Sequence, residues 1–185
     1  MPSSVTGGQA GTRGYAYNSC ARHDTRTLIS AQDVSADAYV DGLKLAAGRE
    51  LSEAQVRQRL ARKGHTPPAI DAAIVRLKDE RAIDDARVAE TIARAETSTR
   101  RRGKLRVRMQ IERAGIAAAT ARKVVDDVFG ELDADALLES ALTRRMLGRD
   151  RIEDDKEFQR LYRYLLNQGF DSDRVMHVLQ ARRKK

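Results

Sequence analysis

The sequence lacks tryptophan, has few aromatic residues and shows no stretch typical of a β-strand. Aromatic residues make up only 4% of the 185 residues, and nowhere do polar and apolar residues alternate over a long enough run to indicate a strand. Ala, Leu, Arg, Glu and Gln, which favour helices, are abundant. We therefore expect an all-α fold, and the 41% apolar content is enough to build a hydrophobic core.

Cysteine and long apolar runs are also scarce. Cys20 is the single cysteine, which excludes an intramolecular disulfide and fits a reducing cytosol. No run approaches the roughly 18 apolar residues of a membrane span, and the N-terminus lacks the cationic start and apolar stretch of a secretory signal. We expect a cytoplasmic protein that does not bind a membrane.

Patterns of metal-binding and catalytic residues are missing as well. The histidines His23, His65 and His177 are scattered, with no HxxxH or CxxC spacing. Gly103-Lys104 shares only two letters with a phosphate-binding loop, and no nucleophile stands beside a plausible base. We expect no metal ion, no cofactor and no enzymatic activity.

Basic residues are plentiful: Lys and Arg number 35 against 27 Asp and Glu, a net charge of +8. This balance favours a negatively charged partner, most simply nucleic acid or a nucleoprotein. Six of the nine residues from Arg100 to Arg108 are cations, and the tail ARRKK is a second basic cluster. A charge run is usually a solvated helix face, but arginines also pair with phosphates and with carboxylates.

Three glycines recur at spacings of 51 and 54 residues: Gly64, Gly115 and Gly169. An apolar residue lies four and eight positions before each glycine, as on one face of a helix. Glycine ends a helix readily because it adopts the left-handed conformation that satisfies the last carbonyls. The apolar pattern returns after each glycine, and another apolar stripe precedes each pair of helices. Each unit is therefore predicted to contain three helices.

The predicted organisation is a disordered leader over residues 1–34, rich in Gly, Ser and Thr, followed by three helical repeats. The repeats cover residues 35–83, 84–131 and 132–185, the second with the basic cluster and the third with the basic tail. A unit of about fifty residues has too small a hydrophobic core to be stable by itself. We therefore expect the repeats to stack into an elongated, curved array.

Helix-start signals support these boundaries. Ser52 with Gln55 resembles a capping box. Asp84 and Asp85 stand at the start of the second unit, where a carboxylate caps a helix and suits its dipole. We interpret this acidic pair as a cap rather than as an acid/base pair.

The basic cluster is predicted to open the second helix of the central unit, from Gly103 to Ala114. At about 100° per residue, Val107 and Ile111 lie on the face shared with the other units, while Leu105 and Met109 point roughly opposite. We expect Leu105 and Met109 to be buried against a neighbouring unit. The alternative is an exposed contact surface for a partner, ringed by arginines.

Three segments, each with one of the repeat glycines, stand out by their order and spacing: RELSEAQVRQRLARKG (49–64), AIDDARVAETIARAETSTRRRGKLRVRMQIERAGI (82–116) and RYLLNQGFDSDRVMHVL (163–179). Through these segments the sequence resembles the RecX family of bacterial recombination regulators, over about residues 36–182. The sequence departs from the family pattern at His65 and Val88, and Asn167 and Gln168 replace cations that are common in the family.

The resemblance implies a non-enzymatic modulator that binds the RecA recombinase, chiefly as its filament on single-stranded DNA. We expect the protein to be a monomer that also binds DNA directly, but weakly. Family members lie in the filament groove, hinder ATP hydrolysis and strand exchange, and favour disassembly, which regulates DNA repair. The residues predicted to contact the filament or DNA are Arg101, Arg102, Lys104, Arg106, Arg108 and Arg113.

An alternative from another class is a helix-turn-helix transcriptional regulator, because residues 52–78 also scan as two helices around a glycine turn. That function requires base-specific binding to duplex DNA, usually by a dimer. Three copies of the hairpin argue against this function, since a repressor needs only one DNA-binding hairpin per chain. A basic scaffold for some other protein is a third alternative.

Overall fold

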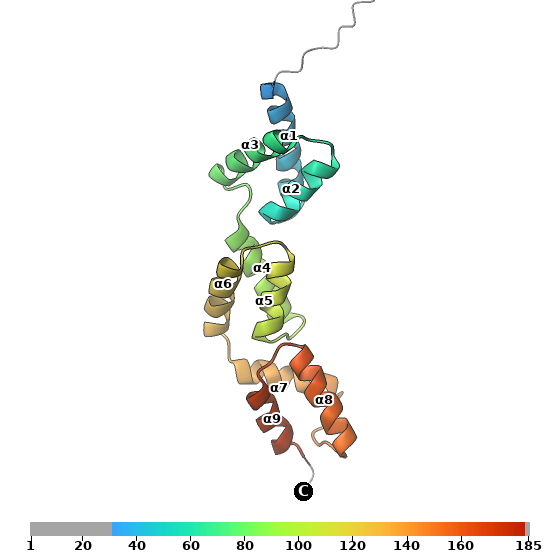
Figure 1. Cartoon of the computed structure of the whole chain (residues 1–185). Coiled ribbons are helices and arrows are strands. Elements are labelled where there is room, and N and C mark those ends of the chain that lie inside the picture. The colour runs from blue at the N-terminus through green and yellow to red at the C-terminus, as the bar shows by residue number, and fades with distance from the viewer. Residues whose placement is uncertain (1–30, 184–185) are drawn as a thin grey trace, which may run out of the picture.

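The computed structural model describes residues 31–183, with side chains from residue 36 onward. Over this range the chain forms nine helices and no sheet, which confirms the all-α prediction (Figure 1). The predicted leader lies outside the described residues except for residues 31–34, which already belong to the first helix. The helices are α1 (Ala31–Gly48), α2 (Glu53–Arg62), α3 (Pro67–Asp79), α4 (Asp85–Ser98), α5 (Lys104–Arg113), α6 (Ala118–Gly130), α7 (Ala134–Arg145), α8 (Asp155–Asn167) and α9 (Ser172–Ala181).

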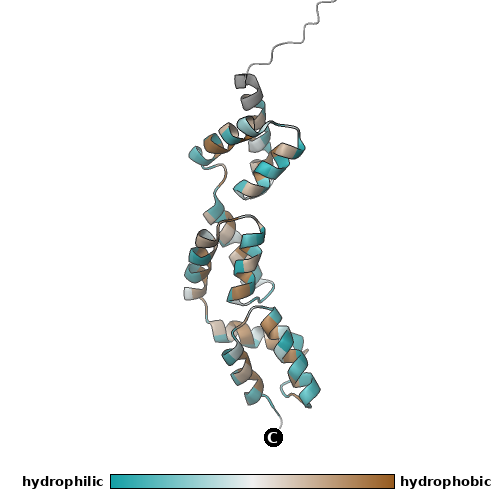
Figure 2. Ribbon diagram, viewed as in Figure 1, coloured by the Kyte–Doolittle hydropathy of each residue, from teal (hydrophilic) through white to brown (hydrophobic). Residues whose placement is uncertain are grey.

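The helices form three units of three, and each unit has its own core. Helices α1, α2 and α3 contact one another, as do α4, α5 and α6, and α7, α8 and α9. The buried apolar residues form three separate clusters, one in each unit. Figure 1 shows the units following one another in an elongated, gently curved array, and Figure 2 shows apolar residues on the helices of every unit. The predicted repeat architecture is therefore confirmed.

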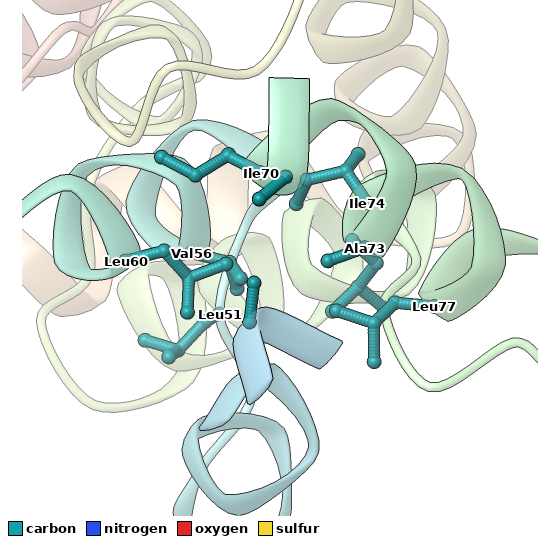
Figure 3. Packing of buried hydrophobic residues seen from close by; sticks show 10 residues of the cluster. Leu51, Val56, Leu60, Ile70, Ala73, Ile74 and Leu77 are labelled. Atoms are coloured by element: carbon teal, nitrogen blue, oxygen red, sulfur yellow. The ribbon is translucent and has the colours of Figure 1, made fainter. Parts of the chain in front are cut away.

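The core of the first unit shows how the predicted apolar stripe is used. Val56 and Leu60 on α2 are fully buried and pack with Ile70, Ile74 and Leu77 of α3 (Figure 3). Burying one such side chain contributes about 1.5–3 kcal/mol. The same face of the second helix is buried in each of the other two units.

The three repeat glycines end the second helix of each unit in the left-handed region. The φ angles of Gly64, Gly115 and Gly169 are 92°, 83° and 87°. An L-residue with a side chain adopts this conformation at a cost of about 1 kcal/mol. Glycine is therefore the residue that lets the chain turn from the second helix of a unit into the third.

The turn of the third unit rests on the N-terminus of α5 in the second. The backbone N–H of Gly103 donates to the carbonyl of Gln168 at 2.9 Å, and that of Leu105 donates to the carbonyl of Gly169 at 3.2 Å. A Cβ atom on Gly169 would overlap the backbone of Arg106, and one on Gly103 would overlap the backbone of Gly169. These two glycines therefore allow the units to approach closely enough for the hydrogen bonds to form.

The turn of the second unit rests on the N-terminus of α2 in a comparable way. The hydroxyl of Ser52 donates to the carbonyl of Ala114. The backbone N–H of Glu53 donates to the carboxylate of Asp85 at 2.8 Å, and a Cβ on Gly115 would overlap the side chain of Ala54. Helices α8, α5 and α2 are thus arranged head to tail. Carbonyls at the end of α8 accept N–H groups at the start of α5, and the carbonyl of Ala114 at the end of α5 accepts the hydroxyl of Ser52 at the start of α2.

Among the described residues, the N-terminus of α8 does not meet another unit, and its N–H groups donate to carboxylates of the third unit itself. This arrangement predicts that the stability of the fold depends on pH. Glu157 is buried, and its pKa is held below the ordinary value of 4.5, first because its carboxylate accepts a hydrogen bond from the backbone N–H of Glu153 and also because Arg149 donates to it. A carboxyl whose pKa is lower in the folded state stabilises the fold above its unfolded pKa. That contribution is lost as the pH falls through the folded value.

We therefore expect Glu157→Gln to be less stable than wild type at neutral pH, and the difference to shrink as the pH falls below about 4.5. Urea denaturation at a series of pH values measures both quantities. A difference that stayed constant down to strongly acidic pH would contradict the assignment.

Candidate functional site

The buried carboxylate of Glu96, near the end of α4, orders the turn that leads into α5. Its side chain is 3% exposed, and its Oε2 lies 2.6 Å from Nη1 of Arg102, while the other oxygen pairs with Arg100. The backbone N–H of Arg102 also donates to the carbonyl of Glu96 at 3.0 Å. Arg101, between these two arginines, has a φ of 52°. Glu96 therefore fixes the conformation from which the basic helix starts.

The same turn contacts the third unit. Nε of Arg101 donates to the hydroxyl of Ser140 on α7. In the opposite direction, Arg144 of α7 donates to the carbonyl of Thr99 at 3.1 Å. The turn is thus tied to both units, and α5 starts from a defined position.

The six predicted cations divide by their partners. Three form ion pairs within the chain: Arg102 with Glu96 at 2.6 Å, Lys104 with Asp126 at 2.7 Å, and Arg108 with Glu112 at 3.6 Å. The other three, for which no carboxylate of the described residues lies within ion-pair distance, are Arg101, Arg106 and Arg113. The basic cluster is therefore partly neutralised by the fold, and its unpaired charge lies on Arg101, Arg106 and Arg113.

The apolar residues between these cations are exposed. Leu105 is 50% exposed and Met109 is 37% exposed, whereas Val107 and Ile111 are fully buried in the core of the second unit. The expected burial of Leu105 and Met109 against a neighbouring unit is wrong, because the units meet at helix ends and turns rather than along the length of α5. The alternative of an exposed, arginine-ringed surface is what the structure shows.

We define the α5 surface as the exposed side of α5 together with its flanking cations: Lys104, Leu105, Arg106, Arg108, Met109 and Arg113. Arg106 and Arg113 are seven residues apart, so they lie on one side of Met109 along the helix. Lys104 and Arg108 lie on the other side. A partner that contacted this surface would meet an apolar strip between two cationic edges.

Two residues of the site, Glu96 and Arg122, were not predicted from the sequence. Glu96 is one of them, although its spacing of four residues from Arg100 is the spacing of a helical ion pair. Arg122 on α6 is exposed, and the fold brings it beside Lys104 and Arg108 around one cavity. Nothing in the sequence near Arg122 indicates this position, because it results from the packing of α6 on α5.

The predicted cap residues lie at helix ends. Ser52 and Gln55 form a capping box at α2. The carboxylate of Asp84 accepts hydrogen bonds from the backbone N–H groups of Ala86 and Arg87 at 2.8 and 3.2 Å. Asp85 instead serves the neighbouring unit, since its carboxylate accepts the N–H at the start of α2.

Comparison with known proteins places this architecture in a family. The family model for the first three-helix domain of RecX matches residues 38–77. The regulatory protein RecX of Chromohalobacter salexigens is 32% identical over 140 residues, which are 75% of this chain and 88% of that protein. The chain belongs to the RecX family. The regulatory protein RecX of Halorhodospira halophila is 30% identical over 155 residues, 83% of this chain and 93% of that protein.

Solved RecX structures share the fold. The crystal structure of RecX from Lactobacillus salivarius matches with a TM-score of 0.66 at 19% identity, and covers 81% of this chain and 97% of that chain. A second crystal structure of regulatory protein RecX has a TM-score of 0.69, also at 19% identity, and covers 81% of this chain and 73% of that chain. The three-unit helical array is therefore an architecture found in RecX proteins.

Two kinds of feature are not found in the described part of this RecX-family protein. Among residues 31–183, no three His, Cys, Asp or Glu side chains come together as potential metal ligands. None of the nine helices in this range is long and apolar enough to cross a membrane. What the range does present is the α5 surface.

Proposed function

We propose that this RecX-family protein binds the RecA recombinase, chiefly as its filament on single-stranded DNA, and restrains ATP hydrolysis, strand exchange and filament growth. It acts by binding, without catalysis of its own. The observation that supports this proposal most directly is the α5 surface, where Arg106 and Arg113 have no carboxylate partner among the described residues, in a protein whose relatives are regulatory proteins. Arginines without a carboxylate partner can pair with phosphates without first breaking an ion pair within the protein.

The shape of the chain agrees with a filament groove as its target. Three units in an elongated array (Figure 1) offer a long contact surface. Hydrogen bonds between the glycine turn of one unit and a helix start of the preceding unit hold neighbouring units together. The α5 surface is at the centre of the array. Its cations would lie toward DNA phosphates and its apolar strip, Leu105 with Met109, toward a protein wall.

The double variant Arg106→Ser/Arg113→Ser tests the contact. We expect its affinity for the RecA filament on single-stranded DNA to fall about tenfold or more at low salt, because two guanidinium groups that would pair with phosphates are removed. The slope of log K against log [salt] should become shallower by about one for each phosphate that is no longer neutralised. Fluorescence anisotropy with a labelled filament measures affinity and salt dependence, and circular dichroism checks helicity.

The matched control is Arg62→Ser/Arg160→Ser, which removes the same charge from exposed positions in the first and third units. It should bind nearly as wild type does. Equal affinity of the wild type and the Arg106/Arg113 variant, or equal losses in both double variants, would contradict a specific role for the α5 surface.

A further inference from the structure

A groove runs between the second and third units, beside the α5 surface. It consists of two adjacent cavities of about 670 and 340 Å³, within the range of ligand sites in proteins. Both are lined by Lys104, Gly169, Phe170 and Asp171. The groove thus follows the junction where the turn of the third unit rests on the start of α5.

The groove is lined in part by accessible apolar side chains. Leu105, which is 50% exposed, lines the larger cavity with Leu166 and Phe170, while Phe129 lines the smaller one. Phe129, Leu166 and Phe170 are only partly buried, at the edges of the cores. An accessible apolar hollow edged by polar groups is typical of a site that takes an apolar side chain from a partner.

The charged side chains that line the groove are mostly cationic. Lys104, Arg108 and Arg122 line the larger cavity, and Arg174 lines the smaller one. Arg122 has no ion-pair partner among residues 36–183. Nε of Arg108 is shielded from solvent and has no hydrogen-bond acceptor among the same residues. Arg122 therefore has unused capacity to bind an anionic group, and the partly exposed side chain of Arg108, whose Nε lies 3.6 Å from Glu112, adds positive charge beside it.

The carboxylates in the groove are already engaged. Asp126 pairs with Lys104 at 2.7 Å, and Asp171 accepts the backbone N–H groups of Asp173 and Arg174 at the start of α9, each at 3.1 Å. They do not neutralise Arg122. They add negative charge beside the apolar lining, which repels a densely charged anion.

We propose that this groove is a docking site for an acidic peptide segment of a partner protein, with a large apolar side chain seated on Leu105 and Phe170 and flanking carboxylates paired with Arg108 and Arg122. Arginine recognises a carboxylate through two parallel hydrogen bonds. Recognition of acidic motifs by clustered arginines is an established mode of peptide binding. The groove includes Lys104, Leu105 and Arg108 of the α5 surface, whereas Arg122 and Phe170 lie outside that surface, so Arg122→Ser tests the groove while leaving the α5 surface unchanged.

The test is selection from a random peptide library displayed on phage, with the full-length protein immobilised. We expect the enriched peptides to carry Asp or Glu on both sides of a Leu, Phe or other large apolar residue. A labelled copy of an enriched peptide then gives the affinity by anisotropy. Replacing its apolar residue by Ser should weaken binding about tenfold or more.

Variants of the protein locate the site. Leu105→Ser and Arg122→Ser should each weaken binding of the enriched peptide about tenfold. The controls Val75→Ser and Lys123→Ser, at exposed positions outside the groove, should leave it unchanged. Enriched peptides without acidic residues, equal losses in the controls, or an Arg122→Ser variant that lost affinity for oligothymidylate while no peptide bound would each overturn the proposal.

Discussion

Replacing Glu96 by alanine should lower the free energy of unfolding by about 3 kcal/mol, because it leaves the largely buried guanidinium of Arg102 without its partner. The carboxylate of Glu96 is 3% exposed and the side chain of Arg102 only 22% exposed, so solvent replaces the carboxylate poorly. The variant also loses what fixes Arg101 in its left-handed conformation. Urea denaturation followed by circular dichroism measures the change.

A matched control lies on the same helix. Glu90 also pairs with an arginine four residues later, Arg94, at 2.8 Å, but both side chains are about half exposed. Exposed ion pairs contribute little to stability because solvent screens them. Glu90→Ala should therefore leave the free energy of unfolding nearly unchanged. Similar losses for Glu96→Ala and Glu90→Ala would show that Glu96 does not organise the turn.

The variant Gly169→Ala should be destabilised by about 3 kcal/mol. Of this, about 1 kcal/mol is the cost of a side chain at a φ of 87°. A further amount of about 2 kcal/mol arises because the new Cβ overlaps the backbone nitrogen of Arg106, and neither backbone segment can move without breaking the hydrogen bonds of the junction. Urea denaturation again gives the value.

Gly64→Ala separates the two contributions. Gly64 has nearly the same conformation, with a φ of 92°, but a Cβ there would meet nothing within 4 Å. Its destabilisation should therefore be only about 1 kcal/mol. The excess in Gly169→Ala measures how tightly the third unit rests on the second, and the absence of any excess would contradict the close approach at this junction.

The fold could be read from the sequence because its signals are local. Gly64, Gly115 and Gly169 end helices through their own backbone conformation, and Asp84 caps α4 through N–H groups two and three residues away. The apolar stripes before the glycines depend only on helical periodicity. Such features need no knowledge of how distant segments meet.

The candidate site was less predictable because it depends on how the units meet. The sequence favours burial of Leu105 and Met109, but only the contact of turns with helix ends determines that the length of α5 stays exposed. Likewise, the pairing of Lys104 with Asp126 depends on the packing of α6 against α5. The sequence indicates where the cations cluster, while the fold determines which of them remain unpaired.

These pairings change which residues should be tested. Arg102 lies within the basic cluster, but its substitution would disturb the turn held by Glu96 as well as any contact with DNA. Arg106 and Arg113 can be replaced without breaking an ion pair of the described residues. Weaker binding by those variants can therefore be assigned to the α5 surface rather than to the fold.

The central claim, that this protein restrains RecA, is tested most directly by the rate of ATP hydrolysis by RecA on single-stranded DNA. Purified protein is added well below an equimolar ratio to RecA. We expect a substantial fall in the rate, because a few molecules bound in the groove of the RecA filament would halt a long filament. An unchanged rate up to an equimolar ratio, with the protein shown to be folded, would contradict it.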